Sequence, residues 1–159
     1  MFDPKYRLLI TTESFPEDQF ICLGSQLILI INVLKEILPL HTWYGADVQA
    51  VGKGVADLNV TGFRLKLIGS DQHFALCCLN ISQFIWGVFL CIDNNSLSSS
   101  IMDVELETED EPYRPIPCDG ILIEIRMFDT SYIEIYSEDE NVIKKISDRF
   151  MRSKIDFKL

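Results

Sequence analysis

The densest group of charged side chains in the sequence is an acidic run at residues 103–111, with the sequence DVELETEDE. It holds six carboxylates and no basic residue, whereas basic residues gather near the end of the chain, at residues 144–158. Such a run favours a surface that recognises a basic protein, because long-range attraction raises the rate of association. The alternative interpretation is a solvated strand edge, where charge discourages edge-to-edge aggregation. The predicted binding residues are Asp103, Glu105, Glu107, Glu109, Asp110 and Glu111, together with Tyr113 and Arg114, which we expect the following proline-rich segment to present to solvent.

Metal-binding and catalytic patterns are missing from the sequence. The acidic run lacks the glycine and the graded ligand spacing of a calcium loop. His73, Cys77 and Cys78 are the only His/Cys grouping, and neither CxxC nor HxxxH occurs, so buried structural cysteines are favoured over a zinc site. There is no GxSxG elbow, phosphate loop or GxGxxG, and no local pattern links a histidine to a cysteine nucleophile. The sequence therefore predicts a non-catalytic protein without a metal or a cofactor.

Net charge, the longest apolar run and the chain length indicate which partners and which architecture to expect. A formal net charge of -10 disfavours direct binding to nucleic acid or to an anionic membrane, since both need a positive surface. The longest apolar run, residues 27–40, contains Asn32, Lys35 and Glu36 and is shorter than the roughly 20 apolar residues of a membrane span, so we predict a buried helix. A length of 159 residues and a hydrophobic content of 48% predict one domain, residues 1–159, with a packed core.

The five cysteines are odd in number and mostly lie in apolar runs. This pattern predicts reduced, buried thiols in a cytoplasmic protein. The first residues, MFDPKYRL, do not resemble a secretory signal, which agrees with that location.

Trp43, Tyr44 and Asp47 form a further candidate group, because aromatic residues near a loop can anchor a partner. The alternative is that the aromatic residues belong to the core. The sequence alone leaves both interpretations open.

Strands and helices must hold the candidate binding residues in place, and the first half of the chain contains signals for both. Residues 6–12 predict a strand, and Ser14 with Glu17 predicts a helix that breaks or bends at Gly24. Residues 25–38 predict a second helix, capped by Ser25 and ending before a proline.

The middle of the chain is richer in strand signals. Residues 63–67 predict a strand with Phe63, Leu65 and Leu67 facing the core. Residues 73–81 favour another strand, with a short helix capped by Ser70 as the alternative.

The apolar run at residues 84–92 predicts a strand buried on both faces. Residues 93–100 predict a loop. In the following stretch, residues 101–107, we expect a strand with Val104 and Leu106 facing inward and its acidic residues facing outward.

Residues 119–150 predict a β-hairpin followed by a capped helix. Matching the apolar rows of the two strands requires a three-residue loop at 129–131 and places Arg126 opposite Glu134, as an exposed pair. Ser137 and Glu140 have the spacing of a capping box, so we expect the helix to start there. The final residues, MRSKIDFKL, are expected to fray or to pack back loosely. The predicted fold is α+β, with a single largely antiparallel sheet and two or three helices packed on it.

The small size, the acidity, the lack of a catalytic motif and the run ILIEIRMFDTSYIEIYSEDENVIKKISDRF together resemble the immunity proteins of bacterial polymorphic-toxin and contact-dependent inhibition systems. The resemblance implies a cytoplasmic protein that binds a cognate basic toxin domain, such as a nuclease, and covers its active site. The alternative is a small-ligand-binding or regulatory domain, with a pocket between the sheet and the helix at 25–38, near His41, Trp43 and His73.

Overall fold

The computed structural model describes residues 1–96, 101 and 103–159, and within them seven strands form one sheet beside four helices. The strand order is β3-β2-β4-β5-β6-β1-β7, and every neighbouring pair is antiparallel. This arrangement confirms the predicted α+β fold. The elements in chain order are β1 (Tyr6–Ile10), a 3₁₀ turn (Thr12–Ser14), α1 (Gly24–Ile37), β2 (His41–Val51), α2 (Gly54–Leu58), β3 (Lys66–Gly69), α3 (Asp71–Leu79), β4 (Gln83–Asp93), a second 3₁₀ turn (Asn94–Ser96), β5 (Ile121–Phe128), β6 (Tyr132–Ser137), α4 (Glu140–Ser147) and β7 (Lys154–Phe157).

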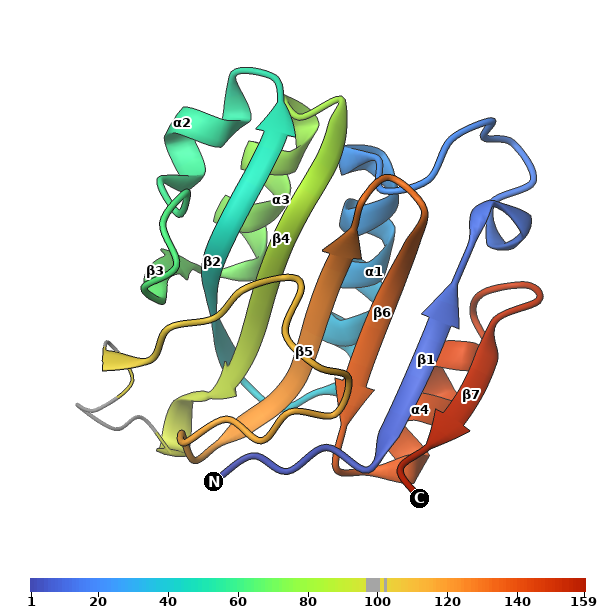
Figure 1. Cartoon of the computed structure of the whole chain (residues 1–159). Coiled ribbons are helices and arrows are strands. Elements are labelled where there is room, and N and C mark those ends of the chain that lie inside the picture. Colours follow the sequence, from blue (N-terminus) through green and yellow to red (C-terminus); the bar gives the residue numbers. More distant parts are fainter. Residues whose placement is uncertain (97–100, 102) are drawn as a thin grey trace.

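The two faces of the sheet are covered in different ways (Figure 1). Helices α1, α3 and α4 lie behind one face, which we call the helix face. The other face, the connection face, is crossed by residues 103–120 of the long segment between β4 and β5, and we call these residues the connection. Each face has its own apolar core, so the central strands are buried on both sides.

Strand β4 illustrates this double burial and confirms the prediction for residues 84–92. Phe89 and Cys91 pack in the core of the helix face, whereas Val88 and Leu90 pack under the connection. The β4 run can be apolar throughout because neither of its faces meets solvent over most of its length.

Helix α1 supplies much of the core on the helix face. Leu27, Ile30, Ile31 and Leu34 are fully buried, as helical spacing requires for one packed stripe. Among the described residues, no helix is long and apolar enough to span a membrane.

The helix expected to begin at Ser14 is not formed, and that prediction is wrong. Residues 15–23 form a loop, and the fully buried side chain of Gln26 holds this loop in place. The Gln26 amide donates to the Asp18 carboxylate at 3.0 Å and to the Phe20 carbonyl at 2.8 Å, and its oxygen accepts from the Leu23 N–H at 3.0 Å. The Gln26 side chain thus bonds to the Leu23 N–H and the Phe20 carbonyl, which in a continuous helix would bond to other backbone groups.

The preference for a strand at residues 73–81 is also wrong, and the helical alternative is confirmed by α3. The Ser70 hydroxyl accepts from the His73 N–H at 3.2 Å and caps the helix. The buried side chains on α3 are Phe74, Cys77 and Cys78, which are spaced as one helical face.

The strand predicted at residues 63–67 is displaced, since β3 begins at Lys66. Leu65 is buried as expected, but Phe63 and Leu67 are 50% and 56% exposed. Residues 63–65, just before β3, pair with the connection through a bridge between Arg64 and Glu105, whereas the preceding residues 60 and 62 bond to β2. The alternation predicted for one continuous strand is therefore interrupted.

The loop predicted at residues 93–100 only partly overlaps the described structure. Residue 93 ends β4 and residues 94–96 form a 3₁₀ turn. Residues 97–100, and residue 102 of the strand predicted next, lie outside the described residues.

The hairpin of β5 and β6 has the predicted loop and register. Met127 lies opposite Ile133 and Arg126 opposite Glu134, with residues 129–131 forming the loop. The prediction that Arg126 and Glu134 form an exposed pair is wrong, because their exposed fractions are 2% and 4%. The connection covers the polar side of this hairpin.

The predicted start of the last helix is wrong by two to three residues. Ser137 belongs to β6, and its hydroxyl donates to the Leu122 carbonyl at 3.1 Å. The helix-capping residue is Asp139, whose carboxylate accepts from the Asn141 N–H at 2.8 Å. The final residues do not fray, since β7 pairs with β1 along its whole length.

Replacing Asp139 with alanine should lower the free energy of unfolding by about 1 kcal/mol, because the Asn141 N–H then loses its acceptor. Asp139→Asn keeps a side-chain oxygen and should cost much less. Urea unfolding of both variants measures the difference. Equal losses in the two variants would contradict the assignment of the cap.

Candidate protein-binding surface

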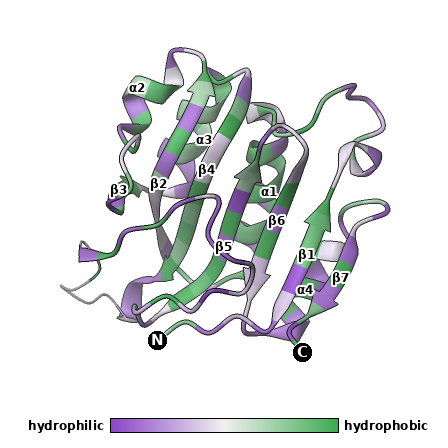
Figure 2. Cartoon of the chain, viewed as in Figure 1, coloured by the Kyte–Doolittle hydropathy of each residue, from purple (hydrophilic) through white to green (hydrophobic). Residues whose placement is uncertain are grey.

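The acidic segment, residues 103–111, lies within the connection, where Figure 2 shows hydrophilic colour over the hydrophobic strands behind it. Val104, Leu106 and Thr108 are buried, and the acidic residues between them are exposed. The inward and outward alternation predicted for 101–107 is thus confirmed where the chain is described. The strand predicted there is wrong, because Glu105 forms only an isolated bridge with Arg64 among the described residues, supported by two 2.8 Å bonds that join residues 63 and 65 to residues 106 and 104.

Asp47 fixes the middle of the acidic segment. Its carboxylate accepts the Thr108 N–H at 2.8 Å, and its side chain lies at a bulge of β2 where the backbone φ is 54°. Asp47 is 7% exposed, so it supports the segment from below and does not itself face a partner.

Arg126 fixes the end of the same segment. From β5, its Nη1 donates to the Asp110 carbonyl at 2.7 Å and to the Glu111 carbonyl at 3.4 Å. Its Nε donates to the Glu124 carboxylate at 2.9 Å, two residues earlier on the strand. A single buried guanidinium thus joins the sheet to the connection.

Around Arg126 lies a buried ionic network, which we define as Arg7, Glu124, Arg126, Glu134 and Tyr136. The Glu134 carboxylate accepts from the Tyr136 hydroxyl at 2.6 Å and from Arg7 Nη1 at 3.0 Å. The Arg126 guanidinium also lies over the Tyr136 ring, 5.1 Å from its centre. These contacts join β1 to β6 within the sheet, and they join β5 to the connection.

Burial sets the protonation of this network. It raises the pKa of Glu124, although the charge of Arg126 acts in the opposite direction. Burial and the nearby Glu134 carboxylate raise the pKa of Tyr136, so its hydroxyl keeps the proton that it donates. One oxygen of Glu124 has no hydrogen-bond partner among the described residues, which makes this carboxylate depend on Arg126.

The predicted binding residues are not all equally exposed. Asp103, Glu105, Glu107, Glu109 and Glu111 face solvent. The Asp110 side chain is only 12% exposed and forms an ion pair with Arg114.

Tyr113 differs from the expectation that it would be presented to solvent. It is half-buried and packs edge-to-face on Tyr136, with ring centres 5.4 Å apart, beneath the guanidinium of Arg7. Arg114 is exposed, as expected.

Trp43 and Tyr44, the predicted aromatic anchors, are 0% and 7% exposed, which confirms the alternative that they belong to the core. The indole N–H of Trp43 donates to the Asp71 carboxylate at 2.7 Å, and Nε2 of His41 contacts the same oxygen at 2.7 Å. These contacts join β2 to the start of α3.

An aromatic row that was not predicted from the sequence lies on the connection face, on neighbouring strands. It consists of Trp86, Phe128 and Tyr132, all half-buried. The rings of Trp86 and Phe128 meet edge-to-face at 5.3 Å, and Phe128 stacks on Tyr132 at 5.0 Å. Trp86 alternates with the same period as Val88 and Leu90, so the sequence indicates the face of β4 on which it lies. The sequence does not show how far along β4 the connection covers that face.

A small depression joins the acidic segment to the aromatic row. Its volume is about 120 Å³, so it can hold the tip of one side chain. Carboxylates and aromatic rings therefore share one surface. The residues that line the depression are Asp47, Gln49, Phe63, Trp86, Glu107 and Glu109.

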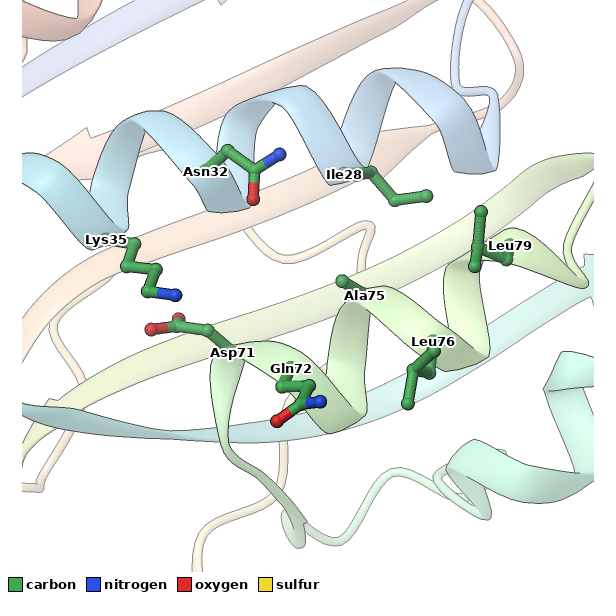
Figure 3. Close-up of a pocket in the computed structure, with 8 residues that line it drawn as sticks. All are labelled: Ile28, Asn32, Lys35, Asp71, Gln72, Ala75, Leu76 and Leu79. Carbon is green, nitrogen blue, oxygen red and sulfur yellow. The ribbon is translucent and has the colours of Figure 1, made fainter.

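A larger groove lies between α1 and α3, with a volume of about 500 Å³ (Figure 3). Ile28 lines its α1 side and Leu76 its α3 side, while Lys35 and Asp71 point toward one another at one end. Buried side chains of α1 fill most of the interface between the sheet and the helix at 25–38, where a pocket was expected. A pocket of about 440 Å³ remains at the end of this helix, lined by Ile37 and Leu38 and by Ile121 and Leu122 of β5.

The His/Cys group on α3 has the features of a structural cluster. The Cys77 sulfur lies 3.8 Å from Nε2 of His73, and burial raises the pKa of the Cys77 thiol, which disfavours the reactive thiolate. All five cysteines are free and buried, as predicted. Within residues 1–96, 101 and 103–159, no three His, Cys, Asp or Glu side chains are arranged to hold a metal ion.

Replacing Arg126 with alanine should lower the free energy of unfolding by about 3–5 kcal/mol, because Glu124 then becomes an unpaired buried carboxylate. Arg114→Ala is the matched control, since it removes an exposed arginine from the same segment and should cost at most about 1 kcal/mol. Urea unfolding compares the two variants. Similar losses would show that the buried network does not hold the connection.

Comparison with known proteins identified no relative of this chain. No family model, curated protein or solved structure matches the chain significantly. On the geometry described above, the strongest candidate site is the surface formed by the acidic segment and the aromatic row.

Proposed function

We propose that this protein is a cytoplasmic, non-catalytic immunity protein that binds a basic toxin domain through the acidic segment and the aromatic row. The observation that carries the proposal is the fixed backbone of the acidic segment. Asp47 and Arg126 hold it from below, while five carboxylates face solvent above. Charges held in this way can attract a partner without first being ordered.

The charge of the surface defines the chemistry of the partner. Lysine and arginine side chains complement exposed carboxylates, and a toxin that binds nucleic acid must carry such side chains where phosphates dock. A nuclease is therefore a fitting partner, because the acidic segment would occupy the groups that otherwise hold its substrate. The immunity protein needs no catalytic group for this kind of inhibition.

The aromatic row would contribute in a different way. Long-range attraction acts mainly on the rate of association, whereas a buried aromatic contact acts mainly on the rate of dissociation. Trp86 lines the depression beside Glu107 and Glu109. An arginine or lysine placed there would contact an aromatic face and two carboxylates together.

Charge reversal tests the acidic segment. The variant Glu105→Lys/Glu107→Lys/Glu109→Lys should slow association with the basic partner by about tenfold or more at low salt and reduce its salt dependence. The partner would first be recovered by pull-down from the native host at low and high salt, and stopped-flow mixing with the purified partner would then give the rates.

The matched control is a second triple variant that has the same net charge as the first. Glu17→Lys/Asp57→Lys/Asp148→Lys reverses three exposed acidic residues outside the connection. If both triple variants slow association equally, only net charge matters and the acidic segment is not the binding surface.

Trp86→Ala tests the aromatic row. The variant should weaken the complex by about 30-fold, chiefly through faster dissociation, because a central tryptophan typically contributes 2 kcal/mol or more. Phe20→Ala, which truncates a 63% exposed aromatic residue outside the row, should leave the affinity unchanged. Surface plasmon resonance separates the two rates, and an unchanged dissociation rate for Trp86→Ala would exclude the row from the interface.

A further inference from the structure

Strand β7 forms one edge of the sheet, and no described residue pairs with its outer side (Figure 1). All of its residues are exposed. The opposite edge is partly covered, because Arg64, just before β3, pairs with Glu105 of the connection. An open edge strand offers unpaired backbone groups to another strand.

The direction of these backbone groups follows from the pairing with β1. The Lys158 N–H donates to the Lys5 carbonyl at 2.8 Å, which fixes the phase of the ladder. Hydrogen-bonded and non-hydrogen-bonded positions alternate in antiparallel pairs, so the even-numbered residues of β7 direct their backbone groups toward β1. The backbone groups of Ile155 and Phe157 consequently point away from the sheet.

The side chains of the edge form two distinct rows. On the connection face, Lys154, Asp156 and Lys158 alternate in charge. On the helix face, Ile155 and Phe157 are 37% and 64% exposed. Edge strands that avoid association usually carry repelling charges, whereas this edge combines balanced charges with exposed apolar side chains.

These two rows restrict how the edge can pair with an identical strand. Outward backbone groups must meet outward groups, so an antiparallel two-fold axis has to pass through a residue. An axis at Lys154 or Asp156 sets like charges opposite one another. An axis at Ile155 sets Lys154 opposite Asp156 on both sides and places the two Ile155 side chains together. An axis at Phe157 also pairs opposite charges, but it places only one residue of β7 opposite a residue of the second β7, whereas the axis at Ile155 places three.

We propose that β7 binds β7 of a second copy of this chain, antiparallel, with the two-fold axis at Ile155. The pairing forms about six backbone hydrogen bonds and two ion pairs, and it buries Ile155 and Phe157. Both connection faces then lie on the same side of a continuous sheet. The interface is small, so the dimer is weak, with a dissociation constant between roughly 10 µM and 1 mM.

Sedimentation equilibrium over a range of concentrations tests the dimer. The wild-type chain should show concentration-dependent dimerisation, and Ile155→Pro should abolish it, because proline removes an outward N–H without breaking a bond to β1. Ile155→Val is the matched control and should still dimerise. A wild-type chain that stays monomeric at about 1 mM, or an Ile155→Pro chain that dimerises normally, would overturn the proposal.

Charge variants test the register without relying on proline. Lys154→Asp alone and Asp156→Lys alone each place like charges opposite one another, so each should weaken self-association by at least about tenfold. An equimolar mixture of the two variants restores opposite charges at both positions and should form heterodimers. If the mixture associates no better than the single variants, the register centred on Ile155 is wrong.

The Asp156→Lys variant also removes a bond within the chain, because Nη2 of Arg7 donates to the Asp156 carboxylate at 2.9 Å. The fold of the variants therefore has to be checked separately. Circular dichroism and thermal unfolding of each variant show whether the β1–β7 pairing is kept. The mixing experiment is itself a control, since two misfolded variants would not recover association on mixing.

Discussion

The buried charge of Arg126 is the constraint on which the connection face depends. A guanidinium without water needs acceptors for its N–H groups, and here they come from Glu124 and from two carbonyls of the connection. The sheet alone cannot supply all of these acceptors. The long connection is therefore tied to one position on the strands, even though it forms little regular structure.

This arrangement explains how an acidic segment can be both well placed and strongly charged. Its inward side chains, such as Val104 and Leu106, pack with the apolar side chains of the connection face. Its backbone is hydrogen-bonded to Asp47 and Arg126, so the outward carboxylates are not needed to hold the segment in place. Apolar packing and hydrogen bonds together oppose the mutual repulsion of the acidic side chains.

The sequence predicted what depends on neighbouring residues and missed what depends on distant ones. Parity alone gave the hairpin loop and the pairing of Arg126 with Glu134, because register is a local property of two strands. Their burial depends on a connection whose acids and prolines are typical of exposed chain. Ser137 matched a capping box, yet its hydroxyl bonds to Leu122 of the neighbouring strand, a contact that sequence spacing cannot show. The aromatic row was missed for the same reason, since Trp86 lies just beyond the covered part of β4.

The alternation along the acidic segment also bears on how such a surface can diverge. Glu105, Glu107 and Glu109 face solvent, while the residues between them maintain the packing. Mutations at the outward positions can change the pattern of charge without altering the core or the bonds that hold the backbone. Recognition and folding are thus encoded at interleaved positions of one short stretch, so related chains could acquire different binding preferences while keeping the same scaffold.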